Sequence, residues 1–353
     1  MAKNVIAIDV GLHSLKAVCL SGSARSTSLS RVAMIPQTAM SQSIQQASEK
    51  AVSAQLKDLV SQLKAGRGEC HIAFNSPSAV LRYVEAPYHP QSDLRASLKL
   101  NHQTYLHQNF ENYTFDGVCL FQDTEHLKKE KKDKKTDVDK TLKKGKTLIA
   151  GLPTTEMLIF YMAAKRAGLE PRSLSLAPLS VINGYECAYP GSFQQEAVLL
   201  LDIGHLSSSL TIVHQGSIFL TRVINLGGKN VLDHLTQTQG SAAAAENAEL
   251  QGGEALAQAI QASLAPMMRE VHSSVNFFER NTEASLKKIV LSGKLAGAPV
   301  TVGVIQQEVG FPCEVWSPAE GMRNSLPASQ KEIFAENQSA FAVCIGTARN
   351  ALS

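Results

Sequence analysis

The chain has 353 residues, 44% of them hydrophobic and 18% charged, with a formal net charge of +3. This composition is typical of a globular protein with a hydrophobic core, the length suggests two lobes, and a disordered or fibrous chain is excluded. No apolar run approaches the ~18 residues that a membrane span requires. Asp9 interrupts the first apolar run, so the start of the chain does not match a secretory signal and predicts a cytoplasmic protein.

The six cysteines are scattered along the chain, and none forms a C-x-x-C pair. This pattern favours buried, reduced thiols over a metal site or a disulfide framework. The cysteines are Cys19, Cys70, Cys119, Cys187, Cys313 and Cys344.

Positive charge gathers between Lys128 and Lys146, where ten lysines face four acidic residues. The segment carries a local charge of +6, which leaves −3 for the rest of the chain. We interpret it as a solvated hairpin loop. A patch for anionic lipid headgroups is the alternative, since lysines near a membrane surface gain about 1 kcal/mol each. The run has no aromatic residue for base stacking, so nucleic acid is not expected as a partner.

The first half of the chain alternates between predicted strands and helices. Apolar runs and alternation predict strands at Val5–Val10, Leu15–Leu20, His71–Phe74, Ala79–Glu85, Tyr113–Phe121 and Thr147–Ala150. Helical spacing predicts helices at Ile44–Leu63, Leu94–Asn109 and Met157–Ala167. The mixture indicates an α/β architecture.

The second half repeats the same plan. Strands are predicted at Val198–Ile203, Leu210–His214, Ile218–Val223, Ile289–Leu291 and Glu314–Trp316. Helices are predicted at Asn230–Thr236, Ala242–Leu250, Ala255–Arg280, Val300–Gln307 and Phe341–Leu352. Pro266 is expected to kink the long helix or to start a turn within it.

Two strand–turn–strand segments share one pattern, AIDVGLHSLKAV (Ala7–Val18) and LLDIGHLSSSLTIV (Leu200–Val213). In each, an apolar strand ends in Asp-x-Gly and is followed by polar residues and a second strand. A glycine turn lets backbone N–H groups point into one concavity, which suits phosphate oxygens. The aspartate can orient Mg²⁺ through water. Two such turns, one in each half, predict a nucleotide cleft between two lobes.

The order of motifs resembles that of the actin-like ATPases, and within them the PilM family of type IV pilus machines, which is related to FtsA. The matching segments cover nearly the whole chain. They are AIDVGLHSLKAV, SPSAVLRYVEAP (Ser76–Pro87), AAKRAGLEPRSLSLAPLSVING (Ala163–Gly184), LLDIGHLSSSLTIVHQGSIFLTRVINLGG (Leu200–Gly228), REVHSSVNFFER (Arg269–Arg280), KKIVLSG (Lys287–Gly293) and AVCIGTARNAL (Ala342–Leu352).

The resemblance implies a two-lobed, actin-like (ribonuclease H-like) α/β fold with an inserted subdomain of the FtsA and PilM type. We expect the first lobe at residues 1–75, the inserted subdomain at 76–150 and the return to the first lobe at 151–196. The second lobe is expected at 197–340, and a C-terminal helix at 341–353 is expected to pack near the cleft.

The resemblance also implies a site for ATP and Mg²⁺, with Asp9 and Asp202 at the metal. The residues that it assigns to the site are Asp9, Gly11, Ser14, Lys16, Asp202, Gly204, Ser207, Ser208, Gly227, Gly228, Glu246, Ser292 and Gly293. For Lys16 a phosphate contact and a solvated strand position are equally open. Alternatively, Glu246 and Glu249 form the polar face of an alanine-rich helix.

The chain departs from the family pattern inside these same motifs. Leu12 and His13 replace hydroxyl residues in the first turn, and His205 and Leu206 replace small or hydroxyl residues in the second. We interpret His13 and His205 as turn residues that face partly into a cleft, rather than as a metal-binding or acid–base pair. Lys294 follows Ser-Gly where the family has a second glycine, and it brings bulk to the adenosine turn. We therefore expect a degenerate nucleotide cleft and no catalytic residue.

The function implied by the resemblance is a cytoplasmic scaffold of a type IV pilus assembly machine. It would bind the N-terminal tail of a PilN-like inner-membrane protein in a groove between the first lobe and the inserted subdomain. The partner would place the scaffold at the inner face of the inner membrane, and contacts with pilus assembly ATPases and with further copies of the chain stay open. The alternatives are an ATP-hydrolysing, FtsA-like filament former and a sugar-kinase-like phosphotransferase.

Overall fold

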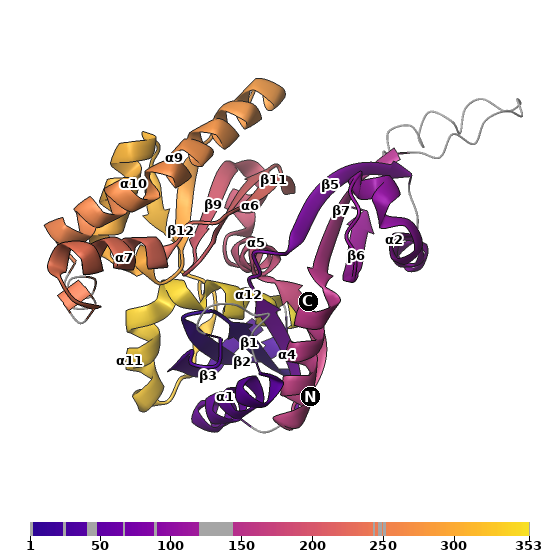
Figure 1. Ribbon diagram of the computed structural model, residues 1–353, viewed down its shortest axis with the longest axis horizontal. Coiled ribbons are helices and arrows are strands. Elements are labelled where there is room, and N and C mark those ends of the chain that lie inside the picture. The colour runs from indigo at the N-terminus through magenta and orange to yellow at the C-terminus, as the bar shows by residue number, and fades with distance from the viewer. Residues whose placement is uncertain are drawn as a thin grey trace, which may run out of the picture. The chain divides into compact units, whose positions relative to one another are not determined.

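The computed structural model describes residues 3–23, 26–40, 48–65, 68–87, 90–119, 144–242, 244–245, 249 and 252–352. Packing divides the chain into two units (Figure 1). The larger unit comprises Met1–Pro77 and Ile159–Ser353, and the smaller unit comprises Ser78–Leu158. Among the described residues, no helix is both long and apolar enough to cross a bilayer.

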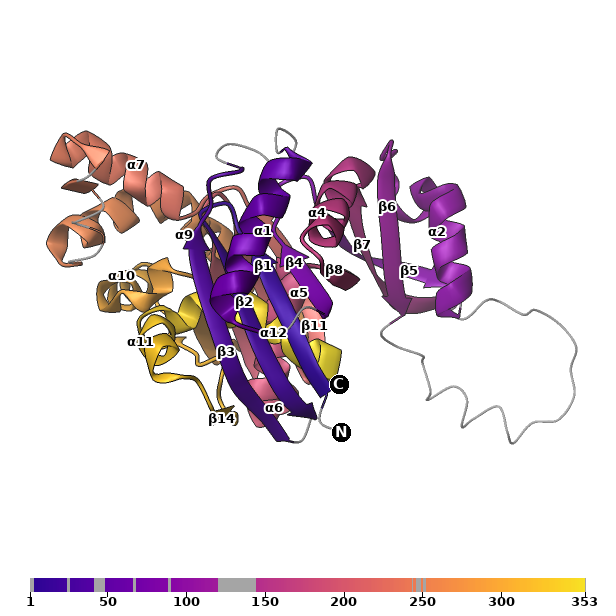
Figure 2. The ribbon, with the colours of Figure 1, turned by 90° about the horizontal axis from the view of Figure 1, so that it is seen from below.

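The first lobe of the larger unit is a six-stranded sheet in the order β14-β3-β2-β1-β4-β8. Its central strand β1 is almost wholly buried, because helices cover the sheet. Figure 2 shows β1, β2 and β3 side by side with α1 across them. The elements are β1 (Lys3–Val10), β2 (Ser14–Ser23), β3 (Ser26–Pro36), α1 (Glu49–Leu63), β4 (Glu69–Phe74), β8 (Glu170–Leu176), β14 (Arg323–Asn324) and the part of α4 (Thr154–Arg166) from Ile159 onward.

The second lobe is a five-stranded sheet in the order β11-β10-β9-β12-β13. Buried side chains from α7, α9 and α10 pack with this sheet into one hydrophobic cluster. The elements are β9 (Ala197–Ile203), β10 (Ser208–His214), β11 (Ser217–Ile224), α7 (Gly228–Gln239), α9 (Glu254–Thr282), β12 (Lys288–Ser292), η2 (Leu295–Gly297), α10 (Pro299–Val309) and β13 (Cys313–Val315).

The two sheets repeat one local arrangement. In the first lobe, β1 pairs antiparallel with β2 and parallel with β4. In the second lobe, β9 pairs antiparallel with β10 and parallel with β12. Asp9 and Asp202 therefore occupy corresponding places near the ends of β1 and β9. This repeat explains why the sequence contains the Asp-x-Gly turn twice.

A shared hydrophobic cluster joins the two lobes. It includes Ala73 of β4, Tyr185 of α5, Val198 of β9, Val290 of β12 and Val343 of α12. The helices that supply or adjoin this cluster are α5 (Ala177–Ala188), α6 (Pro190–Gln195), η3 (Gln338–Phe341) and α12 (Ala342–Leu352). The helix α11 (Ala328–Asn337) comes directly before η3 and packs in the hydrophobic cluster of the first lobe. The joint is thus a packed core and not a flexible linker.

Glycine lets α5 and α12 approach closely within this joint. A Cβ added to Gly346 would lie 1.8 Å from the carbonyl oxygen of Ser180. A Cβ added to Gly184 would lie 3.1 Å from the Gly346 Cα. Glycine is therefore required at position 346 for the observed packing.

The smaller unit is a three-stranded antiparallel sheet in the order β5-β7-β6. Its elements are β5 (Val80–Pro87), α2 (Gln91–Leu106), β6 (Tyr113–Cys119) and β7 (Lys144–Pro153). Leu94 and Leu98 of α2 pack against Ile149 of the sheet in its own hydrophobic cluster. The backbone of α2 leaves the helical region at Asn101.

Most predicted elements are confirmed with shifted ends, including the pairing of the strands that flank the lysine run. The lysine run from residue 128 to 143, and several residues of the predicted helix at 242–250, lie outside the described residues. The prediction that a turn could start at Pro266 was wrong, because α9 is a single 29-residue helix through that residue. Sequence analysis missed β3, β8, α5, α6, α11 and β14.

Candidate functional site

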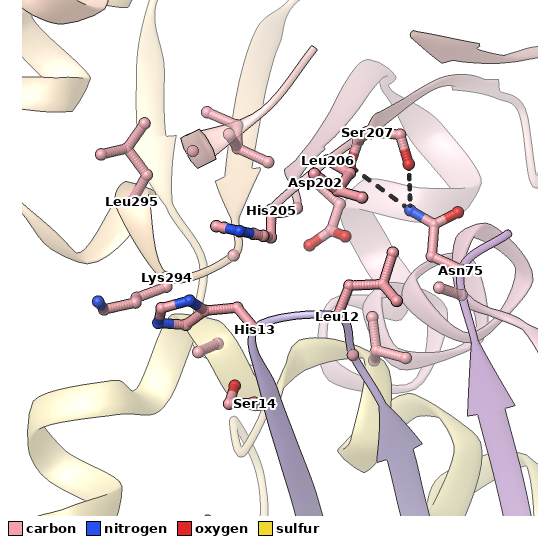
Figure 3. Close-up of a pocket in the computed structure, with 18 of the residues that line it drawn as sticks. Leu12, His13, Ser14, Asn75, Asp202, His205, Leu206, Ser207, Lys294 and Leu295 are labelled. Atoms are coloured by element: carbon pink, nitrogen blue, oxygen red, sulfur yellow. Dashed lines mark hydrogen bonds between the residues drawn. The ribbon is translucent and has the colours of Figure 1, made fainter. Parts of the chain in front are cut away.

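A cavity of about 110 Å³ opens where the β1–β2 turn of the first lobe meets the β9–β10 turn of the second. Figure 3 shows the side chains of both turns converging on this space. The residues following β12 close another side. Because its walls come from both Asp-x-Gly turns, the cavity occupies the place that the sequence predicted for a nucleotide cleft.

Asp9 and Lys16 form a buried ion pair at the cavity. The Lys16 Nζ donates to Asp9 Oδ2 at 2.7 Å, and the two side chains are 11% and 8% exposed. Burial lowers the pKa of the Lys16 ammonium, but the charge and hydrogen bond of Asp9 more than offset this effect, so the pKa is raised. Lys16 is therefore charged at neutral pH, and it is not the solvated strand residue that the sequence left open.

Asp202 takes a different partner. The Ser292 hydroxyl at the end of β12 donates to Asp202 Oδ1 at 2.7 Å. Burial raises the pKa of the Asp202 carboxyl, and the nearby charge of Asp9 raises it further. The Ser292 hydrogen bond and the Lys16 charge oppose this rise without cancelling it. The two corresponding aspartates thus have unequal electrostatic environments.

The turn of the second lobe is folded against the start of α7. The Gly228 N–H donates to the Gly204 carbonyl at 2.9 Å, and the Lys229 N–H donates to the His205 carbonyl at 2.8 Å. A Cβ added to Gly227 would lie 2.4 Å from the Gly204 carbonyl oxygen, so glycine allows this approach. Two amides at the beginning of the helix are therefore bonded within the protein.

His13 and His205 meet across the cavity. Their ring centroids are 4.8 Å apart, with an interplanar angle of 37°. Burial lowers the pKa of His205 to about 4, and the positive surroundings of His13, Lys229 and Lys294 contribute to the shift. His205 is therefore neutral at neutral pH. Figure 3 shows the two rings facing each other with Lys294 beside them.

Two further lysines near the cavity have carboxylate partners. Lys294 Nζ lies 3.4 Å from Glu249 Oε2, and its side chain is 40% exposed. Lys229 Nζ lies 2.6 Å from Asp233 Oδ2. Lys16, Lys229 and Lys294 are therefore each paired with an acidic side chain.

The structure brings most of the predicted site residues to one place. Those lining the cavity are Asp9, Gly11, Ser14, Lys16, Asp202, Gly204, Ser207, Gly228 and Gly293. Ser208, Gly227 and Ser292 lie behind this lining. Ser208 donates to the Leu226 carbonyl at 2.7 Å, and Gly227 packs on Gly204. Glu246 lies outside the described residues.

Sequence analysis missed several lining residues. Asn75 follows β4 and donates from Nδ2 to the Ser207 hydroxyl at 3.0 Å. The sequence could have indicated Asn75, because this residue follows a strand parallel to β1 and parallel strands end at the same edge of a sheet. Leu232, Leu295 and Val343 also line the cavity, and their apolar side chains gave no indication of a site in the sequence. Leu12 and Leu206, noted as departures, line it as well. Among the described residues, no group of three or more His, Cys, Asp or Glu side chains could hold a metal ion.

Comparison with solved structures identifies the fold. A PilM-PilN type IV pilus biogenesis complex matches at 19% identity and a TM-score of 0.81, covering 99% of this chain and 98% of that chain. Ethanolamine utilization protein EutJ from Carboxydothermus hydrogenoformans matches at 11% identity and 0.54, covering 98% and 89%. MreB 5 of Spiroplasma citri, bound to AMPPNP, matches at 12% identity and 0.50, covering 98% and 95%. The chain therefore has the actin-like ATPase fold.

A family model narrows this class. The model described as type IV pilus assembly protein PilM matches residues 162–351, which is more than half of the chain. The chain belongs to the PilM family of type IV pilus assembly proteins. No curated protein sequence matches it.

Proposed function

We propose that this protein is a scaffold of a type IV pilus assembly machine that binds the N-terminal tail of a PilN-like inner-membrane protein. The observation that carries the proposal is the family match together with a likeness, over 99% of the chain, to a structure described as a PilM-PilN complex. An extended tail can add main-chain hydrogen bonds at a sheet edge and place alternate side chains in pockets. The partner would hold the scaffold at the cytoplasmic face of the inner membrane.

The electrostatics of the cleft support a scaffold over an ATPase. A triphosphate needs cationic and N–H donors that can turn to its oxygens. Here Lys16, Lys229 and Lys294 are paired with carboxylates, and the first amides of α7 are bonded to the second turn. The residues present therefore fit ATP·Mg²⁺ poorly, and we propose that the nucleotide cleft is degenerate.

Among the described residues that line the cavity, none is a suitable general base, and this points the same way. A general base works best when its pKa lies near the operating pH. With a pKa of about 4, His205 is neutral but a weak base at neutral pH. Asp9 is engaged by Lys16, and Asp202 by Ser292. We propose weak nucleotide binding at most, without useful turnover.

A peptide titration tests the scaffold directly. The full chain is titrated by calorimetry with the synthetic N-terminal segment of a PilN-like protein, with and without ATP·Mg²⁺, and phosphate release is measured in parallel. We expect saturable binding with the same affinity in both conditions and no phosphate release above background. A scrambled peptide is the control. Absence of binding, or binding only with ATP, would contradict the proposal.

An ATP-hydrolysing actin-like protein, either a filament former or a sugar-kinase-like phosphotransferase, is the second candidate. It is favoured by the convergence of Asp9 and Asp202 on one cavity from two lobes. Sedimentation of the purified protein with and without ATP separates the filament former, since only that candidate pellets in a nucleotide-dependent way. Phosphate release lost in the Asp202→Asn variant would favour the enzyme. Contacts with pilus assembly ATPases and with other copies of the chain are further expectations of the scaffold.

A further inference from the structure

The mouth of the cleft is crossed by direct contacts between the two lobes. His13 follows β1 and contacts His205, which follows β9, with ring centroids 4.8 Å apart. Asn75 follows β4 and donates to the Ser207 hydroxyl at 3.0 Å. Both contacts join residues more than 130 positions apart in the chain. We call these four residues the latch.

Each half of the latch is fixed to its own lobe. In the first lobe, the backbone N–H of Gln37 donates to the His13 carbonyl at 2.9 Å. In the second lobe, the backbone N–H of Lys229 donates to the His205 carbonyl at 2.8 Å. The backbone of each histidine is thus tied to its own lobe, so a movement of one lobe relative to the other would carry the two rings apart.

The latch is separate from the other attachment between the lobes. That attachment comprises the hydrophobic cluster containing Tyr185 of α5 and Val343 of α12, together with two hydrogen bonds between Gly293 after β12 and Ser339 of η3. Val343 also lines the cavity, so the cluster closes its base while the two turns form its mouth. Because the two lobes are joined both at the cluster and at the latch, one lobe cannot rotate about the cluster while the latch is intact.

We propose that the latch of His13, Asn75, His205 and Ser207 holds the two lobes in a closed arrangement without a bound nucleotide. Side chains of the protein would thus make the contact between the two turns that a ligand in the cleft would otherwise make. The inference goes beyond scaffold function, because it concerns the motion of the lobes and not the partner.

The charges around the latch favour closure at neutral pH. His205 faces His13, Lys229, Lys294 and Asp233, and burial together with three of these groups keeps its ring neutral. Asp9, Lys16, Asp202 and Glu249 line the same cavity, with the lysine paired to Asp9. A neutral His205 ring does not repel the ring of His13, whereas two protonated rings at this distance would repel.

A distance measurement between the lobes tests the proposal. Spin labels are placed on exposed positions of α1 and α10, through Lys57→Cys and Gln307→Cys, with Cys119, Cys187 and Cys313 replaced by serine. We expect one narrow distance distribution, unchanged by AMPPNP·Mg²⁺. The first-lobe variant His13→Ala/Asn75→Ala and the second-lobe variant His205→Ala/Ser207→Ala should each broaden it to a similar extent, because each removes the same contacts.

Hydrogen exchange gives a second readout if a double variant folds poorly. In the single variant His13→Gln, the hydrogen-exchange rate of the peptide containing Gly204–Ser207 should rise by about 3- to 10-fold. A rise of this size is expected when a contact about as strong as one hydrogen bond is lost. His272→Ala, at an exposed position of α9, is the control and should change neither turn. An unchanged distance distribution, or exchange that rises only in the mutated turn, would overturn the latch. Peptide binding is measured separately, so failure of the latch leaves the scaffold proposal standing.

Discussion

Lys16 and Asp9 face each other as cross-strand neighbours on β1 and β2, with 2.7 Å between ammonium and carboxylate. In the second lobe, the neighbour of Asp202 at the corresponding position is Ser209. Asp202 is bonded instead by Ser292 from β12. One fold repeat therefore carries an aspartate with a buried counterion, and the other carries an aspartate with only a neutral donor.

This asymmetry predicts opposite effects for the same substitution. Asp9→Asn leaves the Lys16 ammonium buried without its counterion and should cost about 3–5 kcal/mol of unfolding free energy. Asp202→Asn keeps an oxygen that can accept from Ser292 and removes a carboxylate whose pKa burial has raised. A raised carboxyl pKa means that ionisation disfavours the folded state at neutral pH. Asp202→Asn should therefore gain about 0.5–2 kcal/mol.

Urea unfolding at pH 7 measures both variants. The Asp202→Asn gain should shrink as the pH falls toward 3.8, because the native carboxyl then becomes protonated as well. Equal destabilisation by the two substitutions would show that the ionised Asp202 carboxylate stabilises the folded protein, which contradicts the prediction.

The Lys16–Asp9 pair also predicts non-additive mutations. Lys16→Met should destabilise the protein by about 3–5 kcal/mol, because it leaves the Asp9 carboxylate buried and unpaired. The double variant Asp9→Asn/Lys16→Met removes both charges and should recover more than half of that loss. A double-mutant cycle by urea unfolding measures the coupling. Simple addition of the two single losses would mean that the pair is not coupled as its geometry indicates.

Much of the site could be predicted because its signals are local. Asp9 and Gly11 lie within one short turn, as do Asp202 and Gly204, and the repeat of this turn is visible in the sequence. The same turn predicted the two-lobed fold. The partners of these residues were harder to predict: Ser292 reaches Asp202 across 90 residues of chain. Such a contact is set by the parallel pairing of β12 with β9, which no spacing in the sequence specifies.

The missed elements have weak periodic signals for physical reasons. The strand β8 reads EPRSLSL and lies at the edge of its sheet, where four of its seven residues are charged or serine. The helix α5 contains Val181 and Ile182 together with Gly184, which are poor helix formers. It forms because its packing against α12 in the interlobe cluster outweighs local propensity.

The α5–α12 contact predicts a strong effect for a small substitution. Gly346→Ala places a methyl group 1.8 Å from the Ser180 carbonyl oxygen, which is backbone and cannot rotate away. The helices must separate, and we expect a loss of about 1–3 kcal/mol or more. Gly303→Ala in α10 is the matched control, because its added Cβ meets nothing within 4 Å. That variant should gain about 0.5–1 kcal/mol. Thermal unfolding that ranks the two variants in the opposite order would contradict the close approach.

The environment of His205 predicts the pH dependence of stability. Burial and the neighbouring His13, Lys229 and Lys294 hold its pKa at about 4 in the folded protein, against 6.5 for the free side chain. Between these values the unfolded chain binds a proton that the folded protein excludes. The contribution of His205 to stability is therefore fully present above pH 6.5 and is lost as the pH falls toward 4.

The variant His205→Gln should flatten this part of the profile. Because the ring is partly exposed, solvent screening reduces the effect, and we expect the fall in Tm between pH 7 and pH 5 to be about 2 °C smaller than in the wild type. His272→Gln, at an exposed position of α9 where the ring contacts the Glu308 carbonyl, controls for the loss of a histidine. Parallel Tm profiles for His205→Gln and the wild type would place His205 in solvent-like surroundings, and the contact with His13 would then not exclude its proton.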